Sequence, residues 1–541
     1  MPQPGVAAVN KPSVADIKKT AKSHFGWSKL RDGQLDAMQA ALSGRDTLVV
    51  MPTGSGKSAC YQVPALLIDG PTVVVSPLIA LQRDQVVDLL DHGAFAANSA
   101  QRASTIDEGW EDVAAGDVEF IFLSPEQLAK REVRDRLTEV SPSLFVVDEA
   151  HCVAAWGHDF RPDYLRLGDV IEQLGHPVVM ALTATAAPPV REEIVRRLGL
   201  RDPVEVVRGF DRPNLFLEVV QPRSDEAKRD AVVLRAAAEV KPGIVYTATR
   251  KDAETYAAAL SDLGLRAASY HAGMRARARD DVHQRFLDDE LDVVVATTAF
   301  GMGIDKPNVR FVIHADVPES LDAYYQEIGR AGRDGEPSAT VLFYRQEDLG
   351  LRKFFTSSSA DPVVLQRVAK LVEMHDGPIE PPVLREASRL SATRLTTAVN
   401  LLEDAGALTV DETGRIALTD DAPSPADAAD AAMQRAEERE SVDRSRVELV
   451  RGYAETTGCR RQFLIGYFGE SYDPPCDACD RCASGAVADV ETDDFAWCPN
   501  DRVRHDSWGD GVVMRCETDR VTVLFETVGY KTIRLDAVVA A

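Results

Sequence analysis

Short apolar runs alternate with longer stretches of helical periodicity through the first two thirds of this 541-residue chain. Runs of this kind, four to six residues long and rich in Val, Ile and Leu, are typical of buried parallel strands. One set lies at 47–50, 72–76, 120–123, 144–147 and 178–182. A second set begins near Val206 and continues at 243–246, 267–270, 293–296 and 311–314. The pattern predicts two α/β domains, each a doubly wound parallel sheet with its chemistry at the carboxyl ends of the strands.

The first predicted strand runs directly into Met51–Ser58, which reads Met-Pro-Thr-Gly-Ser-Gly-Lys-Ser. Gly54 and Gly56 let consecutive backbone N–H groups face one centre. Lys57 adds a positive charge there, and Ser58 offers a hydroxyl to Mg²⁺ at the start of the next helix. The usual motif begins with Gly where this chain has Met, and an ordinary glycine-rich turn is the alternative. The stretch predicts a site for a nucleoside triphosphate.

Two acids follow the predicted strand at 144–147, in the sequence Asp148-Glu149-Ala150-His151. Asp148 would hold Mg²⁺, directly or through water, and Glu149 would polarise the attacking water. The alternative is an acid pair that caps a helix. The phosphate loop roughly 90 residues upstream favours the catalytic interpretation.

A polar segment after these acids contains Trp156, Phe160 and Arg161. Exposed aromatic rings beside an arginine suit stacking on the bases of a single strand. The alternative is an aromatic pair that closes the end of the sheet. Ahead of the phosphate loop, Gln34 could read an adenine edge because its amide both donates and accepts. Read alone, a polar helix cap is the simpler interpretation of Gln34.

The second set of strands lacks a phosphate loop and carries Arg330 and Arg333 in a glycine-spaced turn instead. Two arginines at this spacing could reach across a cleft to a γ-phosphate held by the first domain. Such an arginine finger would sense whether the triphosphate is present. A solvated helix face is the alternative.

Half of the eight cysteines are grouped in a way that predicts a metal site. Four thiolates are enough for tetrahedral Zn²⁺ and leave no open position, so the role would be structural. Disulfide pairing is the alternative. The predicted ligands are Cys459, Cys476, Cys479 and Cys482, and we expect buried thiols at Cys60, Cys152, Cys498 and Cys516.

The rest of the second half predicts two small modules. Three helical stretches and a glycine-turned pair of strands at 361–420 favour a winged helix, a duplex-binding module, with a helical spacer as the alternative. Arg385, Arg389 and Arg394 would lie near its recognition helix. Short alternating strands at 501–541 favour a small SH3- or Tudor-like β-barrel.

Charge and composition change this picture little. The net charge of −25 lowers the expectation of nucleic acid, because phosphate contacts need Lys and Arg, but acidic residues are concentrated at 411–440 and a basic track elsewhere is compatible with it. No segment approaches the roughly 20 apolar residues of a membrane span. The N-terminus has no signal-peptide core, so we expect a cytoplasmic protein.

Together these motifs resemble the RecQ family of superfamily 2 DNA helicases, in its bacterial form. The resemblance covers about residues 25–350 and rests on the following segments: 25–34, 51–58, 76–78, 124–126, 148–151, 156–164, 182–186, 211–214, 297–306 and 326–335. It implies two RecA-like domains with ATP between them, single-stranded DNA across their top and 3′→5′ translocation. The spacing of the four cysteines is also similar to the zinc module of the family.

The resemblance also implies individual roles. Lys57 would contact the β- and γ-phosphates, Ser58 and Asp148 would hold Mg²⁺, and Glu149 would be the catalytic base. Trp156, Phe160 and Arg161 would sense DNA, Arg330 and Arg333 would reach the phosphates, and which of these two is the principal finger is left open. The implied ATP-binding set is Gln34, Thr53, Gly54, Ser55, Gly56, Lys57 and Ser58.

The expected organisation departs from the family in its second half. The winged helix precedes the zinc module instead of following it, and no helical HRDC module fits. The tail is similar to that of UvrD-type bacterial helicases, which implies a protein partner such as RNA polymerase. The expected segments are an N-terminal extension (1–24) of which residues 1–20 fray, two RecA-like domains (25–205 and 206–352), a winged-helix-like domain (361–420), a linker helix with the zinc module (421–484), a linker (485–500) and the barrel (501–541).

We therefore expect an ATP-dependent 3′→5′ DNA helicase of recombination and repair, acting on single-stranded and forked DNA at the bacterial nucleoid, with no membrane partner. The alternative is a DNA-stimulated ATPase that translocates or remodels protein–DNA complexes with little unwinding, and the displaced winged helix motivates it. A non-catalytic scaffold is disfavoured by Lys57, Glu149 and Arg333. The preferred DNA structure, processivity and oligomeric state do not follow from the sequence.

Overall fold

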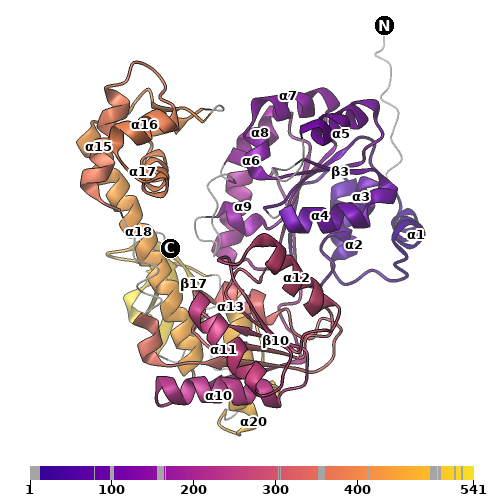
Figure 1. Ribbon diagram of the computed structural model, residues 1–541, viewed down its shortest axis with the longest axis vertical. Coiled ribbons are helices and arrows are strands. Elements are labelled where there is room, and N and C mark those ends of the chain that lie inside the picture. The colour runs from indigo at the N-terminus through magenta and orange to yellow at the C-terminus, as the bar shows by residue number, and fades with distance from the viewer. Residues whose placement is uncertain are drawn as a thin grey trace. The chain divides into compact units, whose positions relative to one another are not determined.

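The computed structural model describes residues 12–77, 79–97, 103–154, 164, 166–301, 304, 306–350, 360–411, 414–487, 496–497, 501–516, 519–525 and 528–541. The chain divides into two compact units, Met1–Phe210 and Asp211–Ala541. Each unit has its own sheet and core (Figure 1). No helix among the described residues combines the length and the apolar character that a membrane crossing requires.

A seven-stranded parallel sheet forms the centre of the first unit, in the order β3-β4-β2-β5-β6-β1-β7. Most of its strands are buried along their whole length, as expected for a sheet covered by helices on both faces. The strands are β1 (Thr47–Val50), β2 (Thr72–Val75), β3 (Ala94–Ala97), β4 (Phe120–Leu123), β5 (Leu144–Val147), β6 (Val178–Thr183) and β7 (Val204–Val207). The predicted parallel sheet is confirmed, with β3 and β7 as strands that the sequence did not assign to it.

The start of the second set of strands was placed too early. Residues 204–207 pair with β1 and are the edge strand of the first sheet, and the second sheet begins at Leu215. An apolar run alone does not reveal which sheet it joins, because the pairing partner is far away in sequence.

The first unit has a helix in the N-terminal part that was expected to fray. They are α1 (Val14–Phe25), α2 (Gln34–Leu42), α3 (Ala59–Ala65), α4 (Ile79–Asp88), α5 (Ala103–Ala115), α6 (Pro125–Leu128), α7 (Arg131–Val140), α8 (Leu167–Gln173) and α9 (Pro188–Leu198), with 3₁₀ turns η1 (Leu90–His92) and η2 (Ala150–Val153). The prediction that residues 1–20 fray is wrong for the described part. Ser13 and Asp16 form a reciprocal capping box, and Ile17 and Ala21 are buried in a small core.

A six-stranded parallel sheet forms the motor part of the second unit, in the order β10-β11-β9-β12-β13-β8. Its strands are β8 (Leu215–Val220), β9 (Gly243–Tyr246), β10 (Ala267–Tyr270), β11 (Val293–Ala296), β12 (Phe311–His314) and β13 (Ser338–Phe343), and its helices include α10 (Asp225–Ala238), α11 (Arg250–Asp262), α12 (Ala276–Leu287) and α13 (Leu321–Ile328), followed by the turn η4 (Gln346–Asp348). The second parallel sheet is thereby confirmed, and β8 and β13 are strands that the sequence reading missed.

Three helices and a short antiparallel hairpin follow the second sheet: α15 (Pro362–Glu373), α16 (Pro381–Ser388), α17 (Ala392–Asp404), β14 (Leu408–Val410) and β15 (Ile416–Leu418). They share one core with the beginning of α18 (Pro425–Glu455), through Ala428, Ala429 and Ala432. The part of the acid-rich stretch from residue 425 onward is therefore helix. In Figure 1, α18 runs as a long orange rod away from α15 and α17.

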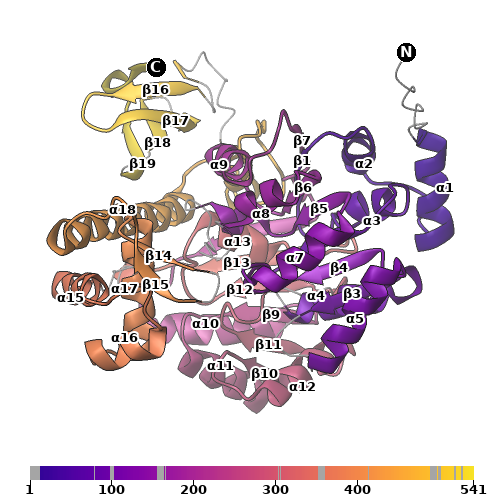
Figure 2. The same ribbon diagram turned by 90° about the horizontal axis from the view of Figure 1, so that it is seen from above.

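The C-terminal tail is a five-stranded antiparallel sheet in the order β19-β18-β17-β16-β20 (Figure 2). Its strands are β16 (Arg502–His505), β17 (Gly509–Cys516), β18 (Arg520–Phe525), β19 (Gly529–Arg534) and β20 (Val539–Ala540), with the turn η5 (Leu535–Ala537) before the last. Between α18 and the tail lie α19 (Arg460–Tyr467) and α20 (Asp480–Ala483).

Strand β19 packs closely on α18. Ser445 Oγ accepts a hydrogen bond of 3.0 Å from Tyr530 N, and Ser441 Oγ donates one of 3.3 Å to Val528 O. Gly529 has φ +70°, and a Cβ there would lie 2.3 Å from Ser445 Oγ and 3.0 Å from the Val442 backbone. The approach is close because this position has no side chain.

We expect Gly529→Ala to loosen the tail from α18, because the added methyl would clash with the helix backbone. The positive φ of this residue adds strain to any side chain placed there. Gly509→Ala is the matched control, since Gly509 has φ +75° and an added methyl there would meet nothing within 4 Å. Gly529→Ala should cost about 1–3 kcal/mol more unfolding free energy than the control, measured by denaturant unfolding. Equal losses in the two variants would contradict the packing described.

Candidate active site and metal centre

The phosphate loop lies between β1 and α3, as predicted. Gly54 and Gly56 both have φ +77°, a conformation that glycine adopts without strain. Lys57 Nζ donates to Met51 O at 3.1 Å, so the ammonium lies over the loop. Thr53 Oγ1 and Ser55 Oγ are buried and hydrogen-bond to no described residue. Buried hydroxyls without partners are costly, and within a nest of amides they fit a bound phosphate.

Gln34 lies against this loop and braces it. Its Nε2 donates to Ser55 O at 3.1 Å and to Gly56 O at 2.9 Å, and its Oε1 accepts from Arg31 N at 2.8 Å. Arg31 Nη1 donates to Gly54 O. Neither adenine contact nor simple capping describes these bonds, and adenine contact by Gln34 stays a prediction.

The acid pair lies at the carboxyl end of β5. Asp148 and Glu149 are 8% and 9% exposed, and Glu149 adopts φ +49°, an uncommon conformation for a residue with a side chain. Burial, reinforced by the Glu149 charge, raises the pKa of Asp148 to about 7, although Lys57 opposes the shift. A buried carboxylate beside a second one suits a divalent cation as partner.

His151 connects the acid pair to the end of β6. Thr183 Oγ1 donates its proton to Thr185 O at 3.1 Å. The 2.9 Å contact between His151 Nδ1 and Thr183 Oγ1 is therefore a bond in which the imidazole N–H donates. The same Nδ1 lies 3.4 Å from Glu149 Oε2, so the imidazole stands beside the predicted base.

Trp156, Phe160 and Arg161 lie outside the described residues, and their DNA-sensing role stays a prediction. Tyr164, which follows them, is fully buried, and its hydroxyl donates to Asp148 O at 3.1 Å. Tyr164, the last residue of the aromatic-rich segment, is thus bonded to the backbone of the predicted Mg²⁺ ligand. Sequence reasoning placed Tyr164 in this segment without a role.

In the second unit, α13 leads into the turn that carries both arginines. Arg330 is 3% exposed, and its guanidinium lies beside Tyr246, where it partly offsets the rise in the pKa of that hydroxyl caused by burial. Arg212 Nη2 donates to Ala331 O at 2.8 Å and to Gly332 O at 2.9 Å, and Asn214 Nδ2 donates to Gly332 O at 2.9 Å. In the sequence, the segment 211–214 is notable only as part of the family resemblance. In the structure its side chains hydrogen-bond to the backbone of the arginine turn.

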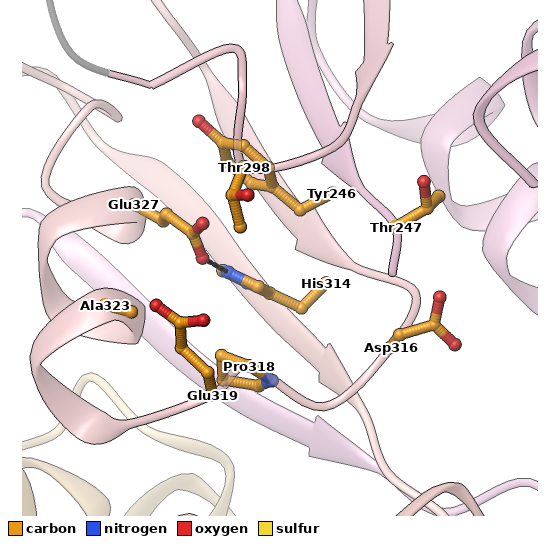
Figure 3. Close-up of a pocket in the computed structure, with 9 residues that line it drawn as sticks. All are labelled: Tyr246, Thr247, Thr298, His314, Asp316, Pro318, Glu319, Ala323 and Glu327. Atoms are coloured by element: carbon orange, nitrogen blue, oxygen red, sulfur yellow. Dashed lines mark hydrogen bonds and ion pairs between the residues drawn. The ribbon is translucent and has the colours of Figure 1, made fainter. Parts of the chain in front are cut away.

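A small pocket lies beneath the same helix (Figure 3). His314 on β12 and Glu327 on α13 point toward each other in it, with 2.7 Å between Nε2 and Oε2, and Tyr246 stacks on the His314 ring at 5.4 Å. Its volume of about 10 Å³ holds about one water. It is too small for a nucleotide, and the pair serves to fix α13.

The four cysteines converge as predicted. Their sulfur atoms all lie within 4.8 Å of one another, and Cys476 Sγ is 3.8 Å from Cys482 Sγ. Tetrahedral zinc with Zn–S bonds of about 2.3 Å places sulfurs about 3.8 Å apart. Hydrogen bonds from Cys459 and Cys476 lower the pKa of the Cys479 thiol. The residues fit zinc, which would supply structure and not chemistry.

Backbone amides complete this centre. Gln462 N donates to Cys459 Sγ at 3.5 Å, Cys482 N to Cys479 Sγ at 3.4 Å and Cys476 N to Cys482 Sγ at 3.4 Å. Such bonds stabilise thiolates. Of the cysteines expected to be buried thiols, Cys60 and Cys152 are buried and Cys516 is half-buried, while Cys498 lies outside the described residues.

A phosphate loop and acid pair on one parallel sheet, with a paired-arginine turn on another, define a two-domain helicase motor. The fold is similar to that of the helicase MrfA bound to DNA (TM-score 0.52, 17% identity, 79% of this chain and 61% of that one). It is also similar to Mycobacterium smegmatis helicase Lhr bound to ssDNA and AMP-PNP (TM-score 0.50, 23% identity, 78% and 62%). At these identities the likeness concerns the fold alone.

Sequence comparisons give the family. The models for the DEAD/DEAH box helicase, the helicase conserved C-terminal domain and the RecQ zinc-binding domain match residues 31–194, 228–335 and 421–483. The probable ATP-dependent DNA helicase RecS of Bacillus subtilis is 35% identical over 86% of this chain and 92% of its own length. The chain belongs to the RecQ family.

Other relatives are longer than the matched region. The ATP-dependent DNA helicase RecQ of Bacillus subtilis is 42% identical over 65% of this chain and 60% of its own length. The RecQ of Haemophilus influenzae is 35% identical over 88% of this chain and 64% of its own length. The chain therefore spans somewhat less than two thirds of these two RecQ proteins.

We expect Asp148→Asn to stabilise the protein in EDTA without nucleotide at pH 8. Folding raises the pKa of this acid from 3.8 to about 7, so the cost of its charge grows as pH rises from 3.8 and is complete above about 7. The gain should be about 0.5–2 kcal/mol, measured by denaturant unfolding.

Asp46→Asn is the matched control, because Asp46 is also buried but accepts bonds from Val179 N, Arg201 N and His176. This variant should lose stability. A loss of stability in both variants would contradict the account of Asp148.

We expect Cys482→Ser to lose zinc, since three thiolates and a hydroxyl bind it more weakly than four thiolates. Metal analysis after dialysis should give about one zinc per wild-type chain and a small fraction of that in the variant. Cys516→Ser, whose sulfur contacts the Trp497 carbonyl, should keep its zinc. Full zinc retention in Cys482→Ser would exclude this ligand.

Proposed function

We propose that this chain is an ATP-dependent DNA helicase that moves 3′→5′ along single-stranded DNA and separates duplex strands in recombination and repair. One observation carries the proposal: this RecQ-family chain has a phosphate loop, in which two buried hydroxyls bond to no described residue, and a buried acid pair on the same sheet. The relative RecS is named a probable ATP-dependent DNA helicase. A DNA substrate makes the bacterial nucleoid the proposed place of action.

The first unit would bind ATP through Gln34 and the loop residues Thr53–Ser58. Lys57 would exchange the Met51 carbonyl for phosphate oxygens, and Thr53 and Ser55 would donate to the same group. Mg²⁺, when bound by Ser58 and Asp148, neutralises charge on the phosphates. Glu149, which lies beside His151, would orient the attacking water and accept its proton.

Coupling to DNA would pass through the segment that ends at Tyr164. We propose that Trp156 and Phe160 stack on bases and that Arg161 contacts the strand. Because Tyr164 is bonded to Asp148 O at 3.1 Å, a movement of this segment on DNA would reach the Mg²⁺ ligand. This offers a path by which DNA stimulates hydrolysis.

Arg330 and Arg333 would complete the site as arginine fingers when the two motor domains close on ATP. Their turn is held at Gly332 O by Arg212 and Asn214, which keeps its geometry independent of the nucleotide. An arginine finger is worth about 10³–10⁵ in hydrolysis rate. Single substitutions of the two arginines would identify the principal finger.

For the remaining chain we propose the segments expected from sequence, with RecA-like domains at 25–205 and 206–352. A winged-helix role for 361–420 is supported by its three helices and hairpin. It is also supported by two exposed arginines, Arg389 at the end of α16 and Arg394 in the first turn of α17. A barrel role for 501–541 is supported by its antiparallel sheet. A protein partner such as RNA polymerase rests on the resemblance of the tail alone.

A second candidate function is a DNA-stimulated translocase with weak unwinding. It is favoured by the position of the three-helix module, which precedes the zinc-binding match at 421–483. A fluorescence strand-separation assay with 3′-tailed, 5′-tailed and blunt duplexes distinguishes the two. Brisk ATP hydrolysis on single-stranded DNA without strand separation would favour the translocase.

We expect Glu149→Gln to lower DNA-stimulated ATP hydrolysis at least 100-fold while ATP still binds, because the amide cannot take the proton. Lys57→Ala should lower both binding and hydrolysis. Lys130→Ala is the control, since Lys130 lies in the first unit on the exposed connection between α6 and α7. Phosphate release and a fluorescent-nucleotide titration measure the two steps. Unchanged hydrolysis in Lys57→Ala would overturn the site assignment.

A further inference from the structure

Helix α13, which leads into Arg330 and Arg333, is buried on every side. All eight of its residues are buried, and each polar one must therefore find a partner. Glu327 pairs with His314 at 2.7 Å (Figure 3). Tyr324 OH lies 3.3 Å from Tyr453 OH on α18, and the Tyr325 ring packs on Phe468 with 4.8 Å between centroids.

Asp322 reaches furthest from the motor sheet. Tyr467 OH on α19 donates to Asp322 Oδ2, and Tyr467 OH lies 3.1 Å from Tyr530 OH on β19. Tyr467 has one proton and gives it to the carboxylate, so Tyr530 donates to Tyr467. A directed chain of hydrogen bonds thus runs from the tail sheet to the helix that leads to the arginines.

The three residues of this hydrogen-bond series are shielded from solvent. Asp322, Tyr467 and Tyr530 are 3%, 4% and 6% exposed. Burial raises the pKa of both tyrosines, so they stay neutral donors. The charge of Asp322 is offset by buried Arg446 on α18. Burial opposes the Arg446 charge, but neighbouring acidic groups, Asp443 foremost and Asp322 among them, outweigh it and raise the pKa of Arg446.

Strand β19, which carries Tyr530, is held on α18 independently of these hydroxyls. Tyr530 N donates to Ser445 Oγ at 3.0 Å, and Gly529 lies against the α18 backbone. The Tyr530 ring is therefore held in place by its own backbone. Removing its hydroxyl would break the chain without releasing the strand.

We propose that Tyr530 and Tyr467 are positioning residues for ATP hydrolysis, which through Asp322 hold α13 so that Arg330 and Arg333 stand ready to reach the nucleotide. This makes the C-terminal sheet a working part of the motor. The inference rests on the proposed function. Neither tyrosine touches ATP, and both act through the helix.

The test measures steady-state ATP hydrolysis by the full chain at saturating single-stranded DNA. In Tyr530→Phe and, separately, Tyr467→Phe, kcat should fall about 5- to 20-fold, a fraction of the 10³–10⁵ of an arginine finger. Binding of a fluorescent ADP should change less than twofold, because the phosphate loop lies in the other unit.

Tyr344→Phe is the matched control. Tyr344 is a buried tyrosine whose hydroxyl donates to a carboxylate, Glu455 on α18, but it follows β13 and does not touch α13 through that bond. It should lose comparable thermal stability and keep kcat within twofold. Equal falls in kcat for Tyr344→Phe and Tyr530→Phe would reduce the effect to general loosening and overturn the proposal.

A double-variant cycle adds a readout that a structural role would not move. Tyr530→Phe is added to Arg330→Ala and, separately, to Arg333→Ala. In the background that lacks the principal finger, Tyr530→Phe should lower kcat by a smaller factor than it does in the wild type. Full additivity with both arginines, or wild-type kcat in both Tyr→Phe variants, overturns the inference. Absence of DNA-stimulated hydrolysis in the wild type would instead overturn the proposed function.

Discussion

The second unit depends on one constraint: a helix with several polar side chains is buried on all its faces. An unpaired polar group in such a place costs about 1–3 kcal/mol, and more if it is charged. Glu327, Tyr324 and Asp322 of α13 therefore take partners from three different elements, β12, α18 and α19. Strand β19 joins them through the bond between Tyr530 and Tyr467. Satisfying one helix ties the motor sheet, the zinc-binding segment and the tail together.

The first unit follows the opposite rule at its acid pair. Asp148 and Glu149 lie side by side, buried, with Glu149 in a left-handed conformation. Neither the like charges nor the backbone conformation favours folding. Asp46 in the same unit shows what a carboxylate selected for stability looks like, with two backbone amides and a histidine as partners. The contrast supports the proposal that Asp148 and Glu149 serve the chemistry of the site and not the stability of the fold.

Features that lie within one short segment were predictable from sequence. The apolar strand cores, Met51–Ser58 and the spacing of four cysteines each carry their information locally, and the structure has both parallel sheets and the converging sulfurs. Features that depend on a distant partner were not predictable. Val206 reads as a strand, but only its pairing with β1 assigns it to the first sheet.

The same limit explains the residues that sequence reasoning missed. Tyr530 is one aromatic residue in a strand, and its proposed role depends on the hydroxyl of Tyr467, 63 residues away, and on the carboxylate of Asp322. Tyr164 follows a polar loop and gains meaning only through its bond to Asp148 O. The helix at Val14–Phe25 is different, because its signal was present: Ser13 and Asp16 stand three residues apart before an i, i+4 apolar pair.

The zinc-binding segment supports the arginine turn from a second side. Cys459 is the N-cap of α19, and the first two residues of this helix are buried arginines, Arg460 and Arg461. Arg460 pairs with Asp480, which follows Cys479, and Arg461 donates to Asp211 and to Leu215 O. Asp211 belongs to the segment whose Arg212 and Asn214 hold Gly332 O. A structural metal with no open position can therefore matter for hydrolysis. The four thiolates would fix α19, and α19 bonds to the segment that holds the arginine turn.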